Sequence, residues 1–231
     1  MVQNIPHHVV IIPDGNRRHA RALGREPWYG HELGAKNTEF LIKKAHKLGI
    51  RELSFWGSSL ENLKKRPLDE TRALLRIYET YFQELAGNAD IHEKQVRVRF
   101  IGRWREQFPA SLKQILISIE ESTKDYDNYG LNFLLAYSGD DDMLQAIEAL
   151  SLSKSKITKE SLKAVLMTHE LPPVDYMIRT GGDPHLSAGF MMWDTANAEL
   201  FFSEALYPAF DEKAFEEAII DYGTRSRRKG K

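Results

Sequence analysis

Near the N-terminus the chain reads His8-Val9-Val10-Ile11-Ile12-Pro13-Asp14-Gly15-Asn16-Arg17-Arg18, a short apolar run followed directly by polar and charged residues. The apolar run predicts a buried strand, and buried parallel strands end in loops that carry function. Asp14 can ligate a hard cation, Gly15 lets the backbone approach an anion, and the two arginines supply charged donors. The segment therefore predicts a site for a metal-bound polyphosphate. An ordinary strand-to-turn junction explains it equally well, because Asp-Gly is a common turn pair.

The composition is that of a globular α/β protein, and we expect one domain over residues 1–231. Hydrophobic residues make up 42% and charged residues 28%, and the net charge of -1 points to no nucleic acid. The absence of cysteine excludes disulfides and Cys-ligated zinc, and it is compatible with the cytoplasm. Residues 1–6 lack a signal pattern, and no apolar run approaches the roughly 20 residues that span a bilayer. We expect any membrane contact to be peripheral.

Strand and helix patterns alternate along the whole chain. The predicted strands are Val9–Pro13, Glu52–Trp56, Val96–Ile101, Leu131–Ala136, Tyr176–Ile178 and Glu199–Phe202. The predicted helices are His31–Leu48, Asp69–Leu85, Ala110–Thr123, Asp141–Leu150, Lys159–Met167 and Glu212–Tyr222. Such alternation favours an α/β fold, with a mostly parallel sheet of about six strands covered by helices on both faces.

Ligands of such sheets bind outside the carboxyl ends of the strands. The segments at those ends are Asp14–Asn16, Gly57–Asn62, Gly102–Arg103, Tyr137–Gly139 and Arg179–Gly182. They are rich in Gly, Ser, Asn and Arg, whose backbone N–H, hydroxyl and guanidinium groups suit phosphate oxygens.

Six segments, in order along nearly the whole chain, resemble the motifs of one enzyme family. They are His8 to Arg18, Gly30-His31, Ser59 to Pro67, Asp175 to Ser187, Trp193 to Phe202, and the tail Arg225 to Gly230. On these segments the chain resembles the cis-prenyltransferases, the undecaprenyl diphosphate synthase family. The resemblance implies a transferase that joins isopentenyl diphosphate to an allylic diphosphate, such as farnesyl diphosphate, and releases diphosphate.

The resemblance also implies the residues of the site. Asp14 and Glu199 are expected to bind Mg²⁺, Asp14 is expected to be catalytic, and Asn62 matches the position assigned to proton removal. An amide is a poor base, so we interpret Asn62 as a residue that positions the departing proton. The expected substrate-binding residues are Gly15, Asn16, Arg17, Arg18, His19, His31, Ser59, Leu60, Glu61, Arg179, His185, Leu186, Ser187, Arg228 and Gly230. Either Lys65 or Arg66 supplies a further cation.

Several positions depart from the common family form. Pro27 and His185 stand where arginines are frequent, and His19 and Leu63 stand where aromatic residues are frequent. Histidine lacks the bidentate fork of arginine and much of its charge at neutral pH. These losses allow an alternative, a non-catalytic partner subunit of another prenyltransferase, although such a subunit has no need of Asp14. An unrelated nucleotide-binding domain is a weaker alternative, because no P-loop or dinucleotide-binding string is present.

Three further expectations concern the product and the assembly. The resemblance implies that the helix Asp69–Leu85 lines an apolar product tunnel, although a generic core helix shows the same pattern. It also implies a homodimer, with the apolar segment Leu200–Tyr207 as interface or as core. A long prenyl product would bring the enzyme to the surface of a membrane.

Overall fold

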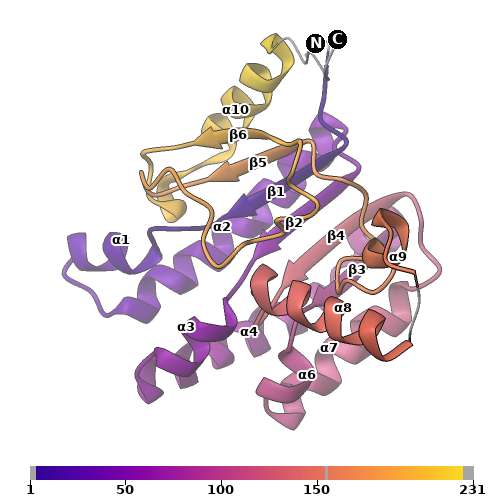
Figure 1. The fold of residues 1–231 in the computed structure, drawn as a ribbon. Helices are drawn as coiled ribbons and strands as arrows, with labels where there is room; N and C mark the ends of the chain where they lie inside the picture. Colours follow the sequence, from indigo (N-terminus) through magenta and orange to yellow (C-terminus); the bar gives the residue numbers. More distant parts are fainter. Residues whose placement is uncertain (1–3, 154–155, 226–231) are drawn as a thin grey trace.

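The centre of the molecule is a six-stranded sheet, seen in a computed structural model that describes residues 4–153 and 156–225 (Figure 1). The strands are β1 (His8–Ile12), β2 (Glu52–Trp56), β3 (Val96–Ile101), β4 (Tyr129–Leu134), β5 (Tyr176–Arg179) and β6 (Glu199–Phe202). Their order across the sheet is β3-β4-β2-β1-β5-β6, and every neighbouring pair is parallel. The predicted fold class is confirmed.

Strand β1 lies inside the sheet between β2 and β5, and all five of its residues are buried. Val10 pairs with Ser54 of β2 on one side and with Met177 of β5 on the other. Since all strands run in one direction, the segments that follow these three strands lie at one edge of the sheet. Strand β3 is an edge strand and, among the described strands, pairs with β4 alone, so Gly102 and Arg103 lie next to the segment that follows β4 rather than next to the segments after β1, β2 and β5.

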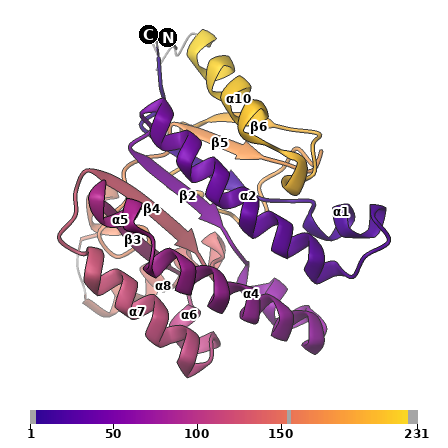
Figure 2. The ribbon, with the colours of Figure 1, turned by 180° about the vertical axis from the view of Figure 1, so that it is seen from behind.

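Helices cover both faces of the sheet. They are α1 (Asn16–Ala22), α2 (Pro27–Leu48), α3 (Leu60–Lys65), α4 (Leu68–Ala86), α5 (Ala89–Glu93), α6 (Trp104–Gln107), α7 (Ala110–Thr123), α8 (Gly139–Ser153), α9 (Lys159–Lys163) and α10 (Glu212–Thr224), with a 3₁₀ turn at Tyr207–Ala209. Helices α2, α4, α7 and α10 lie on one face (Figure 2), and α8 and α9 lie on the other (Figure 1). No helix in the described part of the chain is both long enough and apolar enough to cross a membrane.

The alternation of side chains along β1 divides the core into two layers. Val9 and Ile11 pack into the larger cluster, together with residues of α2, α4, α7 and α10. Val10 and Ile12 pack into the smaller cluster on the opposite face, which includes Trp56 and Phe190. The continuous apolar run of this strand therefore serves two layers, as in other doubly covered parallel sheets.

Three predicted strands, Glu52–Trp56, Val96–Ile101 and Glu199–Phe202, have the predicted bounds. Of the other three, β1 and β4 begin and end one or two residues earlier than predicted, and β5 ends one residue later. The helix Lys159–Met167 is wrong in its second half, because α9 ends at Lys163. There the Lys163 ammonium donates to the carbonyl of Thr168 at 2.7 Å and to the Asp194 carboxylate at 2.6 Å, which stabilises a turn.

The apolar periodicity of the sequence did not predict the short helices. Asn16 to Arg18 form the start of α1, and Leu60 to Lys65 form α3. These helices have seven and six residues, too few for an apolar periodicity to be visible. Both lie directly after a central strand, so both help to build the site.

Candidate active site

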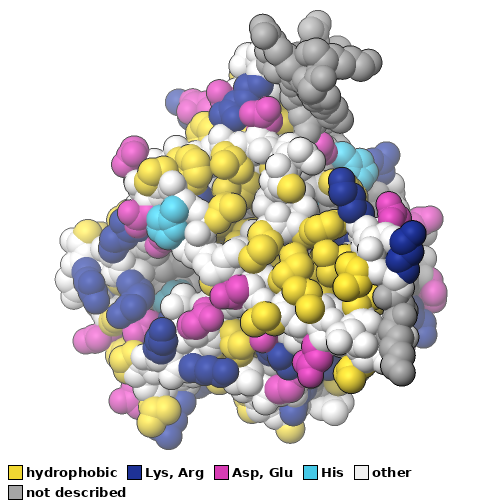
Figure 3. Space-filling model, viewed as in Figure 1, with side chains coloured by type: hydrophobic (Ala, Val, Ile, Leu, Met, Phe, Trp, Pro, Cys, Tyr) yellow, Lys and Arg dark blue, Asp and Glu magenta, His cyan; other side chains and the backbone are white. Residues whose placement is uncertain are grey.

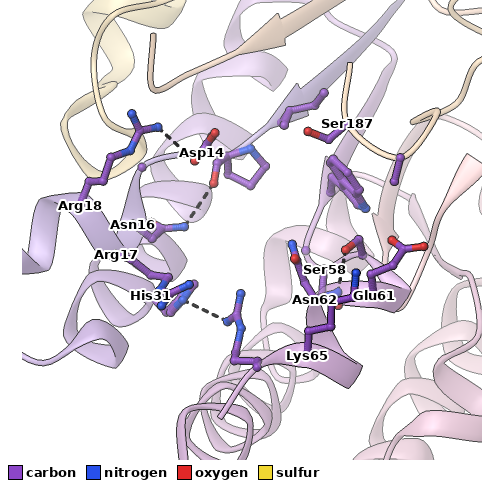
Figure 4. Close-up of a pocket in the computed structure, with 18 of the residues that line it drawn as sticks. Asp14, Asn16, Arg17, Arg18, His31, Ser58, Glu61, Asn62, Lys65 and Ser187 are labelled. Carbon is purple, nitrogen blue, oxygen red and sulfur yellow. Dashed lines mark hydrogen bonds and ion pairs between the residues drawn. The ribbon is translucent and has the colours of Figure 1, made fainter. Parts of the chain in front are cut away.

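A pocket of about 670 Å³ opens at the carboxyl ends of β1, β2 and β5. This volume lies within the range of about 300–1,000 Å³ that is usual for ligand sites. Its lining includes Asp14, Gly15, Asn16, Arg17, Arg18, His31, Ser59, Glu61, Asn62, Lys65, Arg66, Arg179 and Ser187, all of them predicted from the sequence. Figure 4 shows Asp14, Asn16 and His31 on one side of the pocket and Asn62, Glu61 and Lys65 on the other.

Asp14 is held at the end of β1 by contacts of both its backbone and its carboxylate. Its carbonyl accepts hydrogen bonds from the Thr180 hydroxyl at 2.7 Å and from the Tyr207 N–H at 2.9 Å. One carboxylate oxygen accepts from Arg179 Nη2 at 2.8 Å, and the other lies 3.2 Å from Arg18 Nη2. The side chain is 33% exposed and lines the pocket, so its remaining lone pairs face the space that a ligand would occupy.

Gly15 turns the chain from β1 into α1. Its φ is 112°, and a Cβ at this position would lie 2.8 Å from the Cα of Leu206. A side chain is therefore excluded here by both conformation and space. The turn starts α1 at Asn16 and brings Arg17 and Arg18 to the edge of the pocket.

Arg179 connects Asp14 to the loop after β5. Its guanidinium is almost fully buried, and Nη1 donates to the Ser187 hydroxyl at 2.8 Å and to the His185 carbonyl at 2.7 Å. Its Nε is buried and has no hydrogen-bond acceptor among the described residues. The fork of this arginine thus fixes a hydroxyl and a carboxylate side by side on the pocket wall.

His31, from the first turns of α2, meets the basic residue at the end of α3. Its Nε2 accepts a hydrogen bond from Arg66 Nη1 at 3.2 Å. Burial lowers the pKa of His31 to about 3, and the charges of Arg66 and Arg17 act in the same direction. The ring is therefore neutral and serves as an acceptor. The sequence left a choice between Lys65 and Arg66 as the further cation. Both line the pocket, and Arg66 is the one that contacts His31.

Helix α3 forms the opposite wall. The Ser59 hydroxyl caps it by accepting from the backbone N–H of Asn62 at 3.0 Å. Ser138, which follows β4, donates from its hydroxyl to the Glu61 carboxylate at 3.1 Å and accepts from the N–H of Leu60 at 3.3 Å. The Ser59 cap and the hydrogen bonds of Ser138 together fix the orientation of α3. Asn62 on this helix faces the pocket (Figure 4).

The charge of the lining suits a polyanion. Six basic side chains line the pocket (Arg17, Arg18, Arg21, Lys65, Arg66, Arg179), against two acidic ones (Asp14, Glu61). The described residues contain no group of three or more acidic or histidine side chains that could enclose a metal. This small number of carboxylates in the lining fits Mg²⁺, which is usually held by one or two carboxylates and by the phosphates of its substrate.

Glu199 is the main correction to the predicted site. It is the first residue of β6 and pairs with Tyr176, so it lies at the amino end of the sheet, opposite to Asp14. Its carboxylate accepts from Arg225 Nη1 at 3.1 Å. The prediction that Glu199 and Asp14 bind one metal is therefore wrong for a single chain. The predicted strand Glu199–Phe202 already had Glu199 as its first residue, but the metal role of Glu199 was taken from the resemblance and not from its place in the strand.

Four other predicted residues do not line the pocket: His19, Leu60, His185 and Leu186. Leu60 and His185 contribute backbone groups instead: the Leu60 N–H donates to Ser138, and the His185 carbonyl accepts from Arg179. The His185 ring is exposed. Arg228 and Gly230 lie outside the described residues. Pro27 begins α2, while Arg21 of α1 lines the pocket and supplies a cation that the motif comparison did not identify.

The motifs did not assign Trp56, Ser58 or Glu70 to the site, although Ser58 lies in the segment Gly57–Asn62 predicted to follow a strand. Trp56 and Ser58 flank the predicted end of β2, and their place beside the motif was a usable signal. Glu70 is a buried carboxylate in the first turn of α4, four residues after Arg66. That spacing is common on helix surfaces and gave no sign that the carboxylate is buried.

Comparison with known proteins agrees with this geometry. Residues 12–230 match the family model described as "Putative undecaprenyl diphosphate synthase". The chain is 37% identical to the geranylgeranyl-diphosphate-specific tritrans,polycis-undecaprenyl-diphosphate synthase of Pyrococcus horikoshii, over 98% of this chain and 88% of that enzyme. It is also 37% identical to the isoprenyl transferase of Aquifex pyrophilus, over 100% of this chain and 98% of that one.

The fold is shared with a solved structure of a related enzyme. The lavandulyl diphosphate synthase from Lavandula x intermedia, in complex with dimethylallyl diphosphate, superposes with a TM-score of 0.92. The two chains are 27% identical, and the match covers 98% of this chain and 99% of that one. With the pocket and its basic lining, these matches show that the chain belongs to the cis-prenyltransferase, or undecaprenyl diphosphate synthase, family and condenses isopentenyl diphosphate with an allylic diphosphate.

Proposed function

We propose that the pocket holds the two diphosphate groups on opposite sides of Asp14. The allylic diphosphate would lie against Arg17, His31 and Arg66, and isopentenyl diphosphate against Arg179 and Ser187. The observation that supports this division is the position of Asp14. The Asp14 carboxylate contacts Arg179. His31 and Arg66 contact each other and form a separate cluster in the pocket.

The residues of this chain would act mainly by binding charge and by orientation. The C–O bond of the allylic diphosphate breaks, and the developing negative charge on the leaving group is stabilised by the guanidinium groups of Arg17 and Arg66. The C4 of isopentenyl diphosphate forms a bond to the allylic carbon. A proton then leaves the isopentenyl unit, which sets the new cis double bond. The lengthened product is again an allylic diphosphate, so the reaction can repeat.

Asn62 is proposed to orient the departing proton. Its backbone is fixed by the Ser59 cap, and its side chain faces the pocket from α3. Because an amide is a poor base, the proton would pass to a diphosphate oxygen or to water that Asn62 positions.

Asp14 is the residue proposed to hold Mg²⁺, which the family generally requires. When bound, the metal would neutralise diphosphate charge and assist its departure. Arg179 and Arg18 orient the Asp14 carboxylate while leaving lone pairs free toward the pocket.

The prenyl chain is proposed to enter an apolar cavity that continues from the pocket. Pro13, Asn16, His31, Trp56 and Gly57 line both spaces. The deep end is closed by aromatic and aliphatic side chains (Leu74, Ile77, Tyr78, Tyr81, Phe82, Phe133). Its volume is only about 80 Å³, far below the roughly 300 Å³ at which ligand sites usually begin. The cavity as it stands therefore favours a short chain, or must widen as the chain grows.

We further propose that two copies form a dimer through the face that carries α8 and β6. Figure 3 shows hydrophobic side chains gathered on this side of the molecule. Exposed hydrophobic residues of these two elements include Leu144 and Ile147 of α8 and Leu200 of β6. Strand β6 is also an edge strand, which pairs with β5 alone among the described strands. We propose a cytoplasmic enzyme with peripheral membrane contact, since a long prenyl product is apolar.

The proposal is tested by incubating the purified protein with Mg²⁺, labelled isopentenyl diphosphate and, in turn, geranyl, farnesyl and geranylgeranyl diphosphate. We expect a labelled cis-prenyl diphosphate with at least one starter, and its chain length identifies the product. Absence of product with every starter, from a folded protein, would contradict the proposal and favour the partner-subunit alternative.

A further inference from the structure

Glu70 is a buried carboxylate directly behind the basic wall of the pocket. It is the third residue of α4 and is only 5% exposed, and it does not itself line the pocket. A buried carboxylate is costly unless cations or hydrogen-bond donors surround it. The groups around Glu70 therefore explain why it is tolerated there.

Three helices bring positively charged or polar groups to this carboxylate. Its Oε1 lies 3.4 Å from Arg17 Nε of α1 and 3.4 Å from Arg66 Nε at the end of α3. It also lies 3.9 Å from His31 Nε2 of α2, but the lowered pKa of His31 keeps that ring neutral. Glu70 thus pairs with the two arginines, and its position joins α1, α2 and α3 to α4.

Among the described residues, these contacts leave both terminal nitrogens of Arg17 and Nη2 of Arg66 without a hydrogen bond and so available to another anion, while Arg66 Nη1 donates to His31. In both cases Nε is the guanidinium atom nearest to Oε1, and Oε1 has no aligned hydrogen bond with any described residue. The terminal nitrogens of Arg17 make no hydrogen bond within residues 4–153 and 156–225, and its side chain is 45% exposed. An aligned bidentate pair would instead have occupied these donors.

We propose that Glu70 is a positioning residue for the allylic diphosphate. It holds Arg17 and Arg66 by their Nε edges and so directs their terminal nitrogens toward the pocket before substrate arrives. Long side chains that are fixed in advance lose less freedom on binding, which raises affinity. The inference rests on the proposed placement of the allylic diphosphate, but it concerns a residue outside the pocket.

The test is equilibrium binding of each substrate alone, because neither can condense without the other. Glu70→Gln keeps the size of the side chain and removes its charge. We expect its dissociation constant for farnesyl diphosphate to rise about tenfold, since two arginines lose their fixed orientation. The constant for isopentenyl diphosphate should stay unchanged, because Arg179 and Ser187 make no contact with Glu70.

Asp69→Asn is the matched control. Asp69 precedes Glu70 on the same helical turn, its side chain is 90% exposed, and its ion-pair contact is with Arg72. We expect both dissociation constants to be unchanged in this variant. An unchanged or lower constant for farnesyl diphosphate in Glu70→Gln would overturn the inference, and so would an equal weakening of both ligands. A wild-type protein that binds neither substrate would instead contradict the proposed function itself.

A double-mutant cycle is a second test, and it distinguishes an action of Glu70 through Arg17 from a purely structural role of Glu70. If Glu70 acts through Arg17, then Glu70→Gln should weaken farnesyl diphosphate binding less in an Arg17→Gln background than in the wild type. Full additivity of the two changes would overturn the inference. Thermal unfolding of each variant shows whether the protein measured is folded.

Discussion

Asp14 and Arg179 show how far residue types alone can predict a site. Both were predicted because each follows an apolar strand, and the structure brings them to 2.8 Å from each other. Glu199 was predicted from the family resemblance alone, and it lies at the other end of the sheet. The burial of Glu70 was not predicted, because the spacing of residues along a helix does not reveal it.

His8 gives a prediction at the scale of a single residue. It is fully buried, with Nδ1 donating to the Pro172 carbonyl at 2.9 Å and Nε2 accepting from the Ser54 hydroxyl at 2.8 Å. Burial lowers its pKa from 6.5 to about 4, although Pro172 and Asp175 oppose the shift. Between these two values the unfolded chain binds a proton that the folded protein does not bind. Stability is therefore lost as the pH falls through this window.

We expect the contribution of His8 to the free energy of unfolding to fall by about 2 kcal/mol between pH 7 and pH 5. Urea denaturation at the two pH values measures it as the difference between the wild type and His8→Gln. His92→Gln, at an exposed histidine, serves as control and should keep the pH dependence of the wild type. An equal loss of stability in wild type and His8→Gln would contradict this account of His8.

Among the elements, the long ones were predictable and the short ones were not. Helix α7 has the predicted bounds, because its 14 residues repeat an apolar pattern several times. Helices α1 and α3 are defined instead by Gly15 and by the Ser59 cap. Since these two helices carry Arg17 and Asn62, the sequence predicted which residues form the site but not the helices that hold them.

Helix α4 carries a prediction about product length. Tyr81 lines the small apolar cavity, a groove of about 740 Å³ between α2 and α4, and a third cavity near Leu85. Its ring separates these spaces, and its buried hydroxyl has no hydrogen-bond partner among the described residues. Tyr81→Ala should join the spaces and lengthen the product by one or more isoprene units, as measured by chromatography of the products.

Tyr81→Phe is the matched variant for this prediction. It keeps the ring that separates the cavities and removes only the unpartnered hydroxyl, so the chain length of the product should not change. Products of the same length from Tyr81→Ala and the wild type would show that Tyr81 does not limit the chain.

At the scale of the whole molecule, the parallel sheet explains why residues from distant parts of the chain meet. The order β2-β1-β5 places residues near positions 14, 60 and 180 at one edge, and the alternation of strands and helices was sufficient to predict this. The sequence did not separate surface from core in the segment Leu200–Tyr207. In the structure Leu200 is exposed and Tyr207 is buried, so the segment belongs to both.

The proposed dimer is tested on the α8 face. Leu144 and Ile147 are 67% and 50% exposed, so replacing them costs little core packing. We expect light scattering to give twice the mass of one chain for the wild type and a single chain for the double variant Leu144→Asp, Ile147→Asp, because charge opposes burial at an interface. Leu68→Asp, at an exposed leucine of α4, should remain dimeric. A monomeric wild type would contradict the dimer, and a double variant that stays dimeric would show that the interface lies elsewhere.

The central claim is that the pocket around Asp14 joins isopentenyl diphosphate to an allylic diphosphate. The most direct measurement is the rate of labelled product formation by the wild type, by Asp14→Asn and by Asp127→Asn, each with Mg²⁺ and the best starter. Asp127 is an exposed carboxylate near the opposite end of the sheet. We expect Asp14→Asn to lose at least about a hundredfold in rate, because the variant loses the carboxylate proposed to hold the metal that would neutralise the charge of the leaving diphosphate, and we expect Asp127→Asn to match the wild type. Unchanged product formation by a folded Asp14→Asn variant would contradict the account.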